Sequence, residues 1–177
     1  MEVDPTRLAS AALSPYSGEG WRQLSPRHDP LSGEGARLHG GRFNAPASFP
    51  VLYVCRTRPC ALAEMHRLGE RHAIGVPGLL PRHLYRYDIH LDRVLNLTDA
   101  EVRREVGVGL EVLTGPDWTT CQELGANAHA LGAQAILSPS AAGVDDVLAV
   151  FVQHIGLSTI EPTLAEEWHA MVDLETR

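Results

Sequence analysis

The stretch that decides the fold runs from Gly40 to Glu64 and reads GGRFNAPASFPVLYVCRTRPCALAE. A glycine pair and a proline-containing loop lead into the apolar run Phe49–Cys55, which predicts a buried strand. Thr57 then precedes Pro59, a pairing typical of a helix N-terminus with proline in the first turn. We therefore expect a loop, a buried strand and then a helix that ends at about Arg71.

Upstream of this stretch, the first 45 or so residues are rich in turn-forming clusters such as Ser-Pro-Tyr-Ser-Gly and Ser-Gly-Glu-Gly. This composition predicts loops rather than long elements. The apolar residues spaced through the segment can still be buried, which favours an ordered, site-forming loop region; they are Trp21, Leu24, Leu31, Leu38 and Phe43.

Downstream, Pro77 and Pro81 predict a loop. The segments 84–91 and 93–97 are predicted as two separate strands. Thr98 and Glu101 form a capping-box pattern, which predicts a helix from there to about Leu113.

The remaining elements alternate between helix and strand. Asp117 is predicted to cap a helix that runs through Leu131, and two apolar strands follow at 135–137 and 147–152. The tail 163–171 is predicted as a short helix. The whole pattern predicts an α+β protein with one compact domain over residues 1–177 and a core over about 21–152, while residues 1–20 and 160–177 are peripheral.

Composition narrows the class of protein. The chain has 177 residues, 44% of them hydrophobic, and a formal net charge of −7, which argues against non-specific nucleic-acid binding. All 15 basic residues are arginine, so any phosphate held by a side-chain cation is held by a guanidinium. Three cysteines without a paired framework, no signal-peptide pattern and no membrane span predict a cytoplasmic protein.

Two arginines are candidate anion binders. Arg42 follows Gly40-Gly41, and Arg22 lies in Gly-Glu-Gly-Trp-Arg; in both cases glycine lets the backbone approach a ligand. For either arginine taken alone, a surface ion pair with one of the 22 acidic residues is the more common explanation.

Three further residues carry polar groups at suggestive places. Tyr53 in the apolar strand is a ring for stacking on a ligand, or a core tyrosine with a bonded hydroxyl. Glu64 lies at the edge of the apolar face of its helix, where it is functional or paired with Arg67. Ser140 follows a strand, where open sheets bind ligands and where turns also form.

A metal site is not predicted. His66 and His72 are six residues apart, which does not give the shared helix face of an i, i+4 metal pair. Cysteine–histidine nucleophile chemistry has no support in the sequence either.

Taken in order, these positions resemble the RES domain, a family named for its arginine, glutamate and serine. The resemblance covers about Trp21 to Val152, from Trp-Arg through Gly-Gly-Arg-Phe-Asn, Val-Leu-Tyr-Val and Ala-Leu-Ala-Glu to Asp-Trp and Ile-Leu-Ser-Pro-Ser. Phe43 stands where the family often has tryptophan. The resemblance implies a split β-sheet core with flanking helices, like that of ADP-ribosyltransferases.

It also implies a function. RES proteins are toxins of bacterial toxin–antitoxin pairs that degrade NAD⁺ by phosphorolysis or hydrolysis, and some transfer ADP-ribose to proteins. The implied partner is an Xre-type helix-turn-helix antitoxin, in a hetero-oligomer. NAD⁺ is the implied substrate and inorganic phosphate the co-substrate, with no bound cofactor.

The same resemblance assigns roles to five residues. Glu64, Arg42 and Arg22 are implied to be catalytic, with Glu64 stabilising an oxocarbenium-like transition state. Arg22, Arg42, Tyr53 and Ser140 are implied to bind the substrate. Two other readings stay open: protein ADP-ribosylation at the same site, and a non-catalytic domain that binds a nucleotide or a partner.

Overall fold

A computed structural model describes residues 5–156 and 159–175. Its helices are α1 (Pro5–Ser10), α2 (Glu34–His39), α3 (Arg58–Arg71), α4 (Gly75–Leu79), α5 (Ala100–Val106), α6 (Leu110–Thr114) and α7 (Thr119–Ala130). Its strands are β1 (Ser14–Leu24), β2 (Val51–Cys55), β3 (Arg82–Asn96), β4 (Ala135–Pro139), β5 (Asp146–Phe151) and β6 (Ile160–Trp168). Two 3₁₀ turns cover Val152–His154 and Met171–Leu174.

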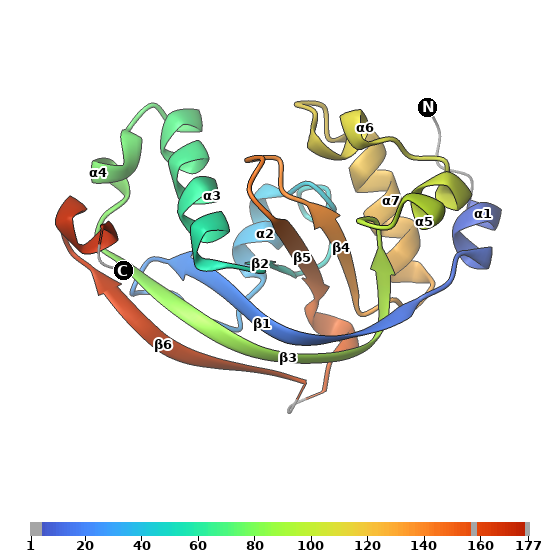
Figure 1. Cartoon of the computed structure of the whole chain (residues 1–177), viewed down its shortest axis with the longest axis horizontal. Coiled ribbons are helices and arrows are strands. Elements are labelled where there is room, and N and C mark those ends of the chain that lie inside the picture. Colours follow the sequence, from blue (N-terminus) through green and yellow to red (C-terminus); the bar gives the residue numbers. More distant parts are fainter. Residues whose placement is uncertain (1–4, 157–158, 176–177) are drawn as a thin grey trace.

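The six strands form one sheet in the order β1-β2-β5-β4-β3-β6, and β1 also pairs with β3. That extra pairing closes β1, β2, β5, β4 and β3 into a ring, with β6 added on β3 (Figure 1). A single compact α+β domain with flanking helices is therefore confirmed. The split sheet implied by the resemblance is not seen, because the long antiparallel pairing of β1 with β3 joins the two ends of the sheet.

The loop-rich prediction for the first 45 residues is wrong for β1, an 11-residue strand. Gly20 suits this strand because the inside of the ring has no room for a side chain at that position. A Cβ on Gly20 would lie 2.4 Å from Val54 Cγ1 and 2.7 Å from Ile89 Cδ1, so only glycine fits there. Local composition indicated turns, but the partner strand decided the outcome.

The two strands predicted over 84–97 are one continuous strand, β3. Its first part, 82–89, pairs with β1 on one side and β6 on the other, and its last three residues, 94–96, pair in parallel with β4. Residues 14–20 and 160–168, expected at the periphery, both pair along β3.

The single helix predicted from Thr98 to Leu113 is two helices. Gly107, with φ of 81°, ends α5 in the left-handed conformation that glycine adopts without strain. The cap at its start is Asp99, whose carboxylate accepts from the Glu101 amide, whereas the Thr98 hydroxyl donates to Asn96. The capping-box assignment was therefore wrong by one residue.

The helix predicted over 163–171 is also wrong, because residues 160–168 form β6. The segment Leu-Ala-Glu-Glu favours a helix locally, but pairing with β3 and burial of Ile160 and Trp168 at the two ends of the strand override that preference. The Glu166 carboxylate makes a bidentate ion pair with Arg58, at 2.7 Å for both bonds.

Helices α3 and α7 lie on either side of the strands β2, β5 and β4 (Figure 1). The Thr57 hydroxyl caps α3 by accepting from the Cys60 amide, so the predicted start of that helix is confirmed. The strands predicted around 51–55, 135–137 and 147–152 and the helix 117–131 are confirmed to within two residues. The loop predicted at Pro77 holds the short helix α4.

Three buried clusters hold these elements together. One fills the inside of the ring, one lies between the sheet and α7, and one lies between the sheet and α3. In the described residues, no helix combines the length and apolar character needed to cross a bilayer.

Candidate functional site between α3 and the loop 41–44

Glu64 and Ser140 meet although they are 76 residues apart. The Ser140 hydroxyl donates to Glu64 Oε1 at 2.7 Å, and Arg67 Nη1 donates to Oε2 at 3.2 Å. Ser140 is 4% exposed, whereas the Glu64 side chain is 30% exposed. The carboxylate is thus held at both oxygens and still open to a ligand.

The position of each partner follows from its element. Ser140 comes directly after β4, and its hydroxyl also accepts from the Ala142 amide at 3.0 Å, which fixes the loop. Glu64 is in the second turn of α3, and the helix packs on the sheet through Cys60, Ala61 and Met65. The predicted ion pair of Glu64 with Arg67 is therefore present, and a functional role of the same carboxylate stays a prediction.

Tyr53 holds the loop 41–44 through its hydroxyl. The hydroxyl donates to Asn44 Oδ1 and accepts from the Phe43 amide, both at 2.8 Å. Burial of this group raises the pKa of Tyr53 above its ordinary value, so it stays protonated and keeps donating. The Tyr53 side chain is half-buried and its hydroxyl is occupied by these two bonds. Stacking of its ring on a ligand stays a prediction.

Arg42 is fixed by contacts with the segment that leads into α7. Its Nη1 donates to the Gly115 carbonyl at 2.9 Å, and its guanidinium lies over the Trp118 ring at 5.5 Å from the centroid. Gln122 Nε2 donates to the Gly41 carbonyl at 3.0 Å. The loop 41–44 is therefore held by hydrogen bonds from both Tyr53 and α7.

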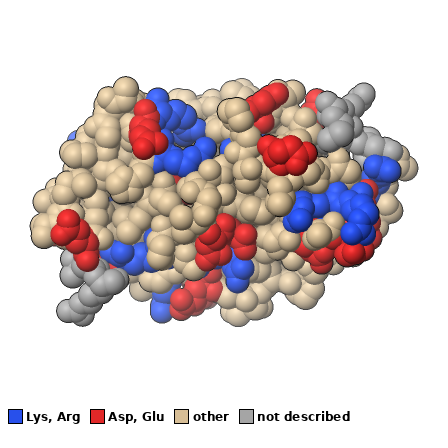
Figure 2. Space-filling model, turned by 45° about the horizontal axis from the view of Figure 1, so that its top comes forward, with Lys and Arg blue, Asp and Glu red and all other residues tan. Residues whose placement is uncertain are grey.

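Arg71 connects this loop to α3. Its guanidinium lies 5.3 Å from the centroid of the same Trp118 ring. Arg71 is two turns after Glu64 on α3, so Trp118 links the half of the site that carries Arg42 to the half that carries Glu64. In Figure 2, arginine side chains gather beside acidic ones over the α3 end of this face.

The contacts of Arg22 are with a different part of the chain from those of Arg42 and Glu64. Its Nη1 donates to the carbonyls of Pro30 and Ser32 at 3.2 and 3.3 Å, and on β1 it is opposite Tyr85. None of its described hydrogen bonds reaches Glu64 or Ser140. The role implied for Arg22 by the resemblance stays a prediction.

Two residues at the site were missed by sequence reasoning. Asn44 is fully buried, and its amide bonds the Ala36 carbonyl at 2.7 Å while its Oδ1 accepts from Tyr53. Arg71 contacts Trp118. Two signals could have found them: Asn44 ends the segment Gly-Gly-Arg-Phe-Asn, and Arg71 is seven residues after Glu64 in the same helix.

A thiol nucleophile is not favoured at this site. Cys121 is buried beside Arg42, and its burial raises the pKa of the thiol, although Arg42 acts in the opposite direction. The side chain therefore stays a neutral thiol and packs in the core.

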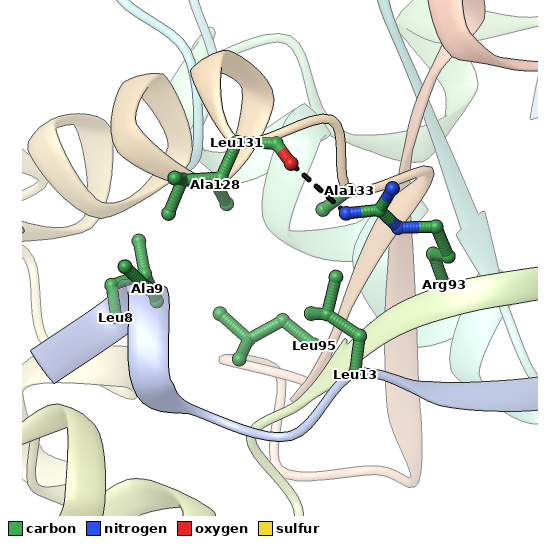
Figure 3. Close-up of a pocket in the computed structure, with 8 residues that line it drawn as sticks. All are labelled: Leu8, Ala9, Leu13, Arg93, Leu95, Ala128, Leu131 and Ala133. Atoms are coloured by element: carbon green, nitrogen blue, oxygen red, sulfur yellow. Dashed lines mark hydrogen bonds between the residues drawn. The ribbon is translucent and has the colours of Figure 1, made fainter.

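A separate pocket of about 180 Å³ lies between α1, α7 and β3 (Figure 3). Its lining is mostly apolar, with Leu95, Leu131 and their neighbours around it and one cation, Arg93, which donates to the Leu131 carbonyl at 3.0 Å. No candidate site residue lines it. This pocket is smaller than the roughly 300 Å³ at which small-molecule sites begin, and with one cation it does not suit a dinucleotide with two phosphates.

Comparison with known proteins identifies relatives of the whole chain. The model of the family described as "RES domain" matches residues 19–173. The proteins named NAD(+) phosphorylase MbcT of Mycobacterium tuberculosis (strain ATCC 25618 / H37Rv) and Mycobacterium bovis are each 32% identical over 149 residues, 83% of this chain and 80% of theirs.

A solved structure is similar over nearly the whole length. It is a chain of the crystal structure of the M. tuberculosis MbcT-MbcA toxin-antitoxin complex, with a TM-score of 0.86 and 28% identity. The match covers 97% of this chain and 94% of the other.

Proposed function

Because this chain belongs to the RES domain family, we propose that it is an NAD⁺ phosphorylase that acts as the toxin of a toxin–antitoxin pair. It cleaves the bond between nicotinamide and ribose. Inorganic phosphate is the co-substrate, and no bound cofactor takes part. The names of the MbcT relatives and the toxin–antitoxin complex support this proposal.

One observation within the molecule supports it most directly: the 2.7 Å hydrogen bond between Ser140 and Glu64. It brings together two of the residues that the family resemblance singled out, although they are 76 residues apart in the sequence. An oriented, partly exposed carboxylate beside a group of arginines matches the chemistry that a nucleotide with a cationic leaving group requires.

The reaction balances without an external oxidant or reductant. An oxygen of inorganic phosphate forms a bond to ribose C1′, and the electron pair of the C1′–N bond leaves with nicotinamide, whose ring loses its positive charge. The transition state resembles an oxocarbenium ion. Glu64 stabilises the positive charge that develops on the ribose, and Ser140 and Arg67 keep its carboxylate in place.

The remaining predicted residues bind the substrate. Arg42 and Arg22 bind phosphate groups through bidentate bonds, and the ring of Tyr53 packs against the nicotinamide or the ribose. Ser140 also forms a hydrogen bond to the substrate near its nicotinamide group. These assignments, and the likeness of fold to ADP-ribosyltransferases that the resemblance implies, are part of the proposal.

The partner is an antitoxin, by analogy with the MbcT-MbcA complex. We expect it to be an Xre-type helix-turn-helix protein that blocks the site. The cytoplasm is the expected location, because it holds NAD⁺ and its reducing conditions suit three free, buried cysteines.

The experiment incubates the purified protein with NAD⁺, with and without inorganic phosphate, and measures released nicotinamide and sugar phosphate. NAD⁺ loss that depends on phosphate supports phosphorolysis, and equal loss in both supports hydrolysis. Nicotinamide release with label on an added protein supports ADP-ribosyl transfer. No loss of NAD⁺ under any of these conditions would overturn the proposed activity.

A further inference from the structure

Two arginines from distant parts of the chain share one indole ring. The guanidinium carbons of Arg42 and Arg71 lie 5.5 and 5.3 Å from the centroid of Trp118. The two positive groups are therefore at most about 11 Å apart. Like charges repel, so the electrostatic interaction between the two guanidinium groups does not itself stabilise this arrangement.

Neither arginine is neutralised by a described carboxylate. Arg42 bonds a carbonyl and lies beside the neutral thiol of Cys121, and Arg71 lies over Trp118. Six other arginines do form ion pairs with acidic residues: Arg37, Arg56, Arg58, Arg67, Arg86 and Arg104. In a chain of net charge −7, two cations that contact the same ring and have no such partners are a candidate place for an anion.

The position of the pair relative to Glu64 indicates which anion. Arg71 is seven residues after Glu64, which places it on the same face of α3 and roughly 10 Å further along the helix axis. In NAD⁺ the pyrophosphate is attached to the far side of the ribose from nicotinamide. A ribose beside Glu64 therefore has its phosphate groups near Arg71 and Arg42.

We propose that Arg71 is a further substrate-binding residue, and that Arg71 and Arg42 together bind a phosphate group while Trp118 holds both side chains in place. The identity of the substrate rests on the proposed function. The shared chemistry is a phosphate oxygen, which belongs either to the pyrophosphate of NAD⁺ or to inorganic phosphate. Charge-assisted bonds to a guanidinium fork suit both.

The test compares wild-type protein with Arg71→Met, which keeps the aliphatic stem and removes the charge, and with Arg71→Lys, which keeps the charge and loses the fork. Arg104→Met is the matched control, because Arg104 is exposed on α5 and paired only with Glu101 among the described residues. KM is measured for NAD⁺ and for inorganic phosphate separately, together with kcat and the melting temperature.

We expect Arg71→Met to raise one KM about tenfold or more, the effect of a lost charge-assisted bond. Arg71→Lys should show a smaller increase, and Arg104→Met should stay within about twofold of wild type. A selective rise for NAD⁺ assigns the pyrophosphate, and a selective rise for phosphate assigns the co-substrate. Arg71 also lies in the last turn of α3, where a cation favours the helix dipole; a lower melting temperature with both KM values unchanged would mean that this is its only role.

A binding assay without turnover separates this inference from the proposed function. Inorganic pyrophosphate is titrated into wild type and Arg71→Met while tryptophan fluorescence is followed, and Trp118→Phe identifies the signal from that ring. Pyrophosphate binding that Arg71→Met weakens about tenfold supports the anion site even if NAD⁺ is not consumed. Equal pyrophosphate affinity in the two proteins, or unchanged KM values in an active enzyme, would overturn it.

Discussion

Glu64 is oriented by two neighbours that bind different oxygens of its carboxylate. Ser140 donates to one oxygen at 2.7 Å and Arg67 to the other at 3.2 Å. In the proposed mechanism, a carboxylate held in this way does not have to reorient when positive charge develops on the ribose. Preorganisation of this kind is a large part of the effect of electrostatic catalysis.

At the residue scale we predict the effect of Glu64→Gln. The amide keeps the shape and can still accept from Ser140, but it removes the negative charge. We expect kcat to fall about 10² to 10³-fold, as when one preorganised charge is lost, with an unchanged melting temperature. Steady-state kinetics and thermal unfolding measure both quantities.

The matched control is Glu70→Gln, on the exposed side of the same helix. It should keep wild-type kcat. Wild-type activity in Glu64→Gln would refute the role that we assign to this carboxylate.

At the scale of elements, the site depends on how closely α7 approaches the loop 41–44. Gly125 lies in α7, where an added Cβ would be 1.8 Å from the Phe43 carbonyl oxygen. Gln122, one turn earlier, bonds the Gly41 carbonyl. The helix therefore sets the position of the loop that carries Arg42.

This close approach makes Gly125→Ala a test of the loop. The new methyl group must push the loop away from α7, and overpacking of this kind costs about 1–3 kcal/mol of unfolding free energy. We also expect kcat/KM to fall at least about tenfold, because misplacement of about 1 Å at a positioning residue can cost up to 10²-fold. Chemical denaturation and kinetics give the two values.

Gly35→Ala is the control for this prediction. Gly35 lies in α2, and an added Cβ there meets no atom within 4 Å. That variant should be as stable as wild type or more stable by about 0.5–1 kcal/mol, since alanine favours a helix. An active, stable Gly125→Ala protein would show that α7 does not fix the loop.

At the scale of the whole molecule, an aromatic stack joins α7 to the end of β5. The His129 ring stacks on Phe49 and on His154, with centroids 4.1 and 4.2 Å apart. Burial, and then the nearby His154, lower the pKa of His129, while the hydrogen bond that His129 Nε2 donates to Gln153 Oε1 opposes them. The stack therefore holds a histidine that resists protonation.

The direction of the pH effect follows from linkage. In the unfolded chain His129 titrates near its ordinary pKa of about 6.5, so as the pH falls through that value the unfolded state takes up a proton first. The unfolding free energy should therefore decrease between about pH 7 and pH 5.5. His129→Phe keeps a stacked ring without a titrating group and should show a flatter dependence.

Denaturant unfolding at several pH values measures this difference. His66→Gln is the control, because His66 is exposed on α3. It should keep the wild-type slope. Equal slopes for His129→Phe and wild type would contradict the prediction.

The parts of the fold that were predictable are those in which local pattern and tertiary environment agree. The strand 51–55 is apolar on both faces and is buried on both, and α3 begins at a threonine that caps it. The errors fall where pairing overrode local preference. β1 is a strand despite its glycines because β3 lies alongside it, and β6 is a strand despite its helix-forming residues for the same reason.

The candidate site divides in the same way. Arginine, tyrosine, glutamate and serine were predicted because their motifs are short and each follows a recognisable loop, strand or helix. Asn44 and Arg71 were not, because the contact of Asn44 with Tyr53 depends on the conformation of an irregular loop and Arg71 is far in the sequence from its partner, Trp118.

By itself the sequence determined the class of the fold, the family and the chemical groups of the candidate site, because each of these depends on short-range pattern. Only the tertiary structure decided that the stretch from Gly40 to Glu64 is shared between two halves of a site. The closed ring of strands places Ser140 against Glu64, and Trp118 joins Arg42 to α3. Contacts between residues 76 apart are set by strand order, which the local free energies of a sequence do not specify.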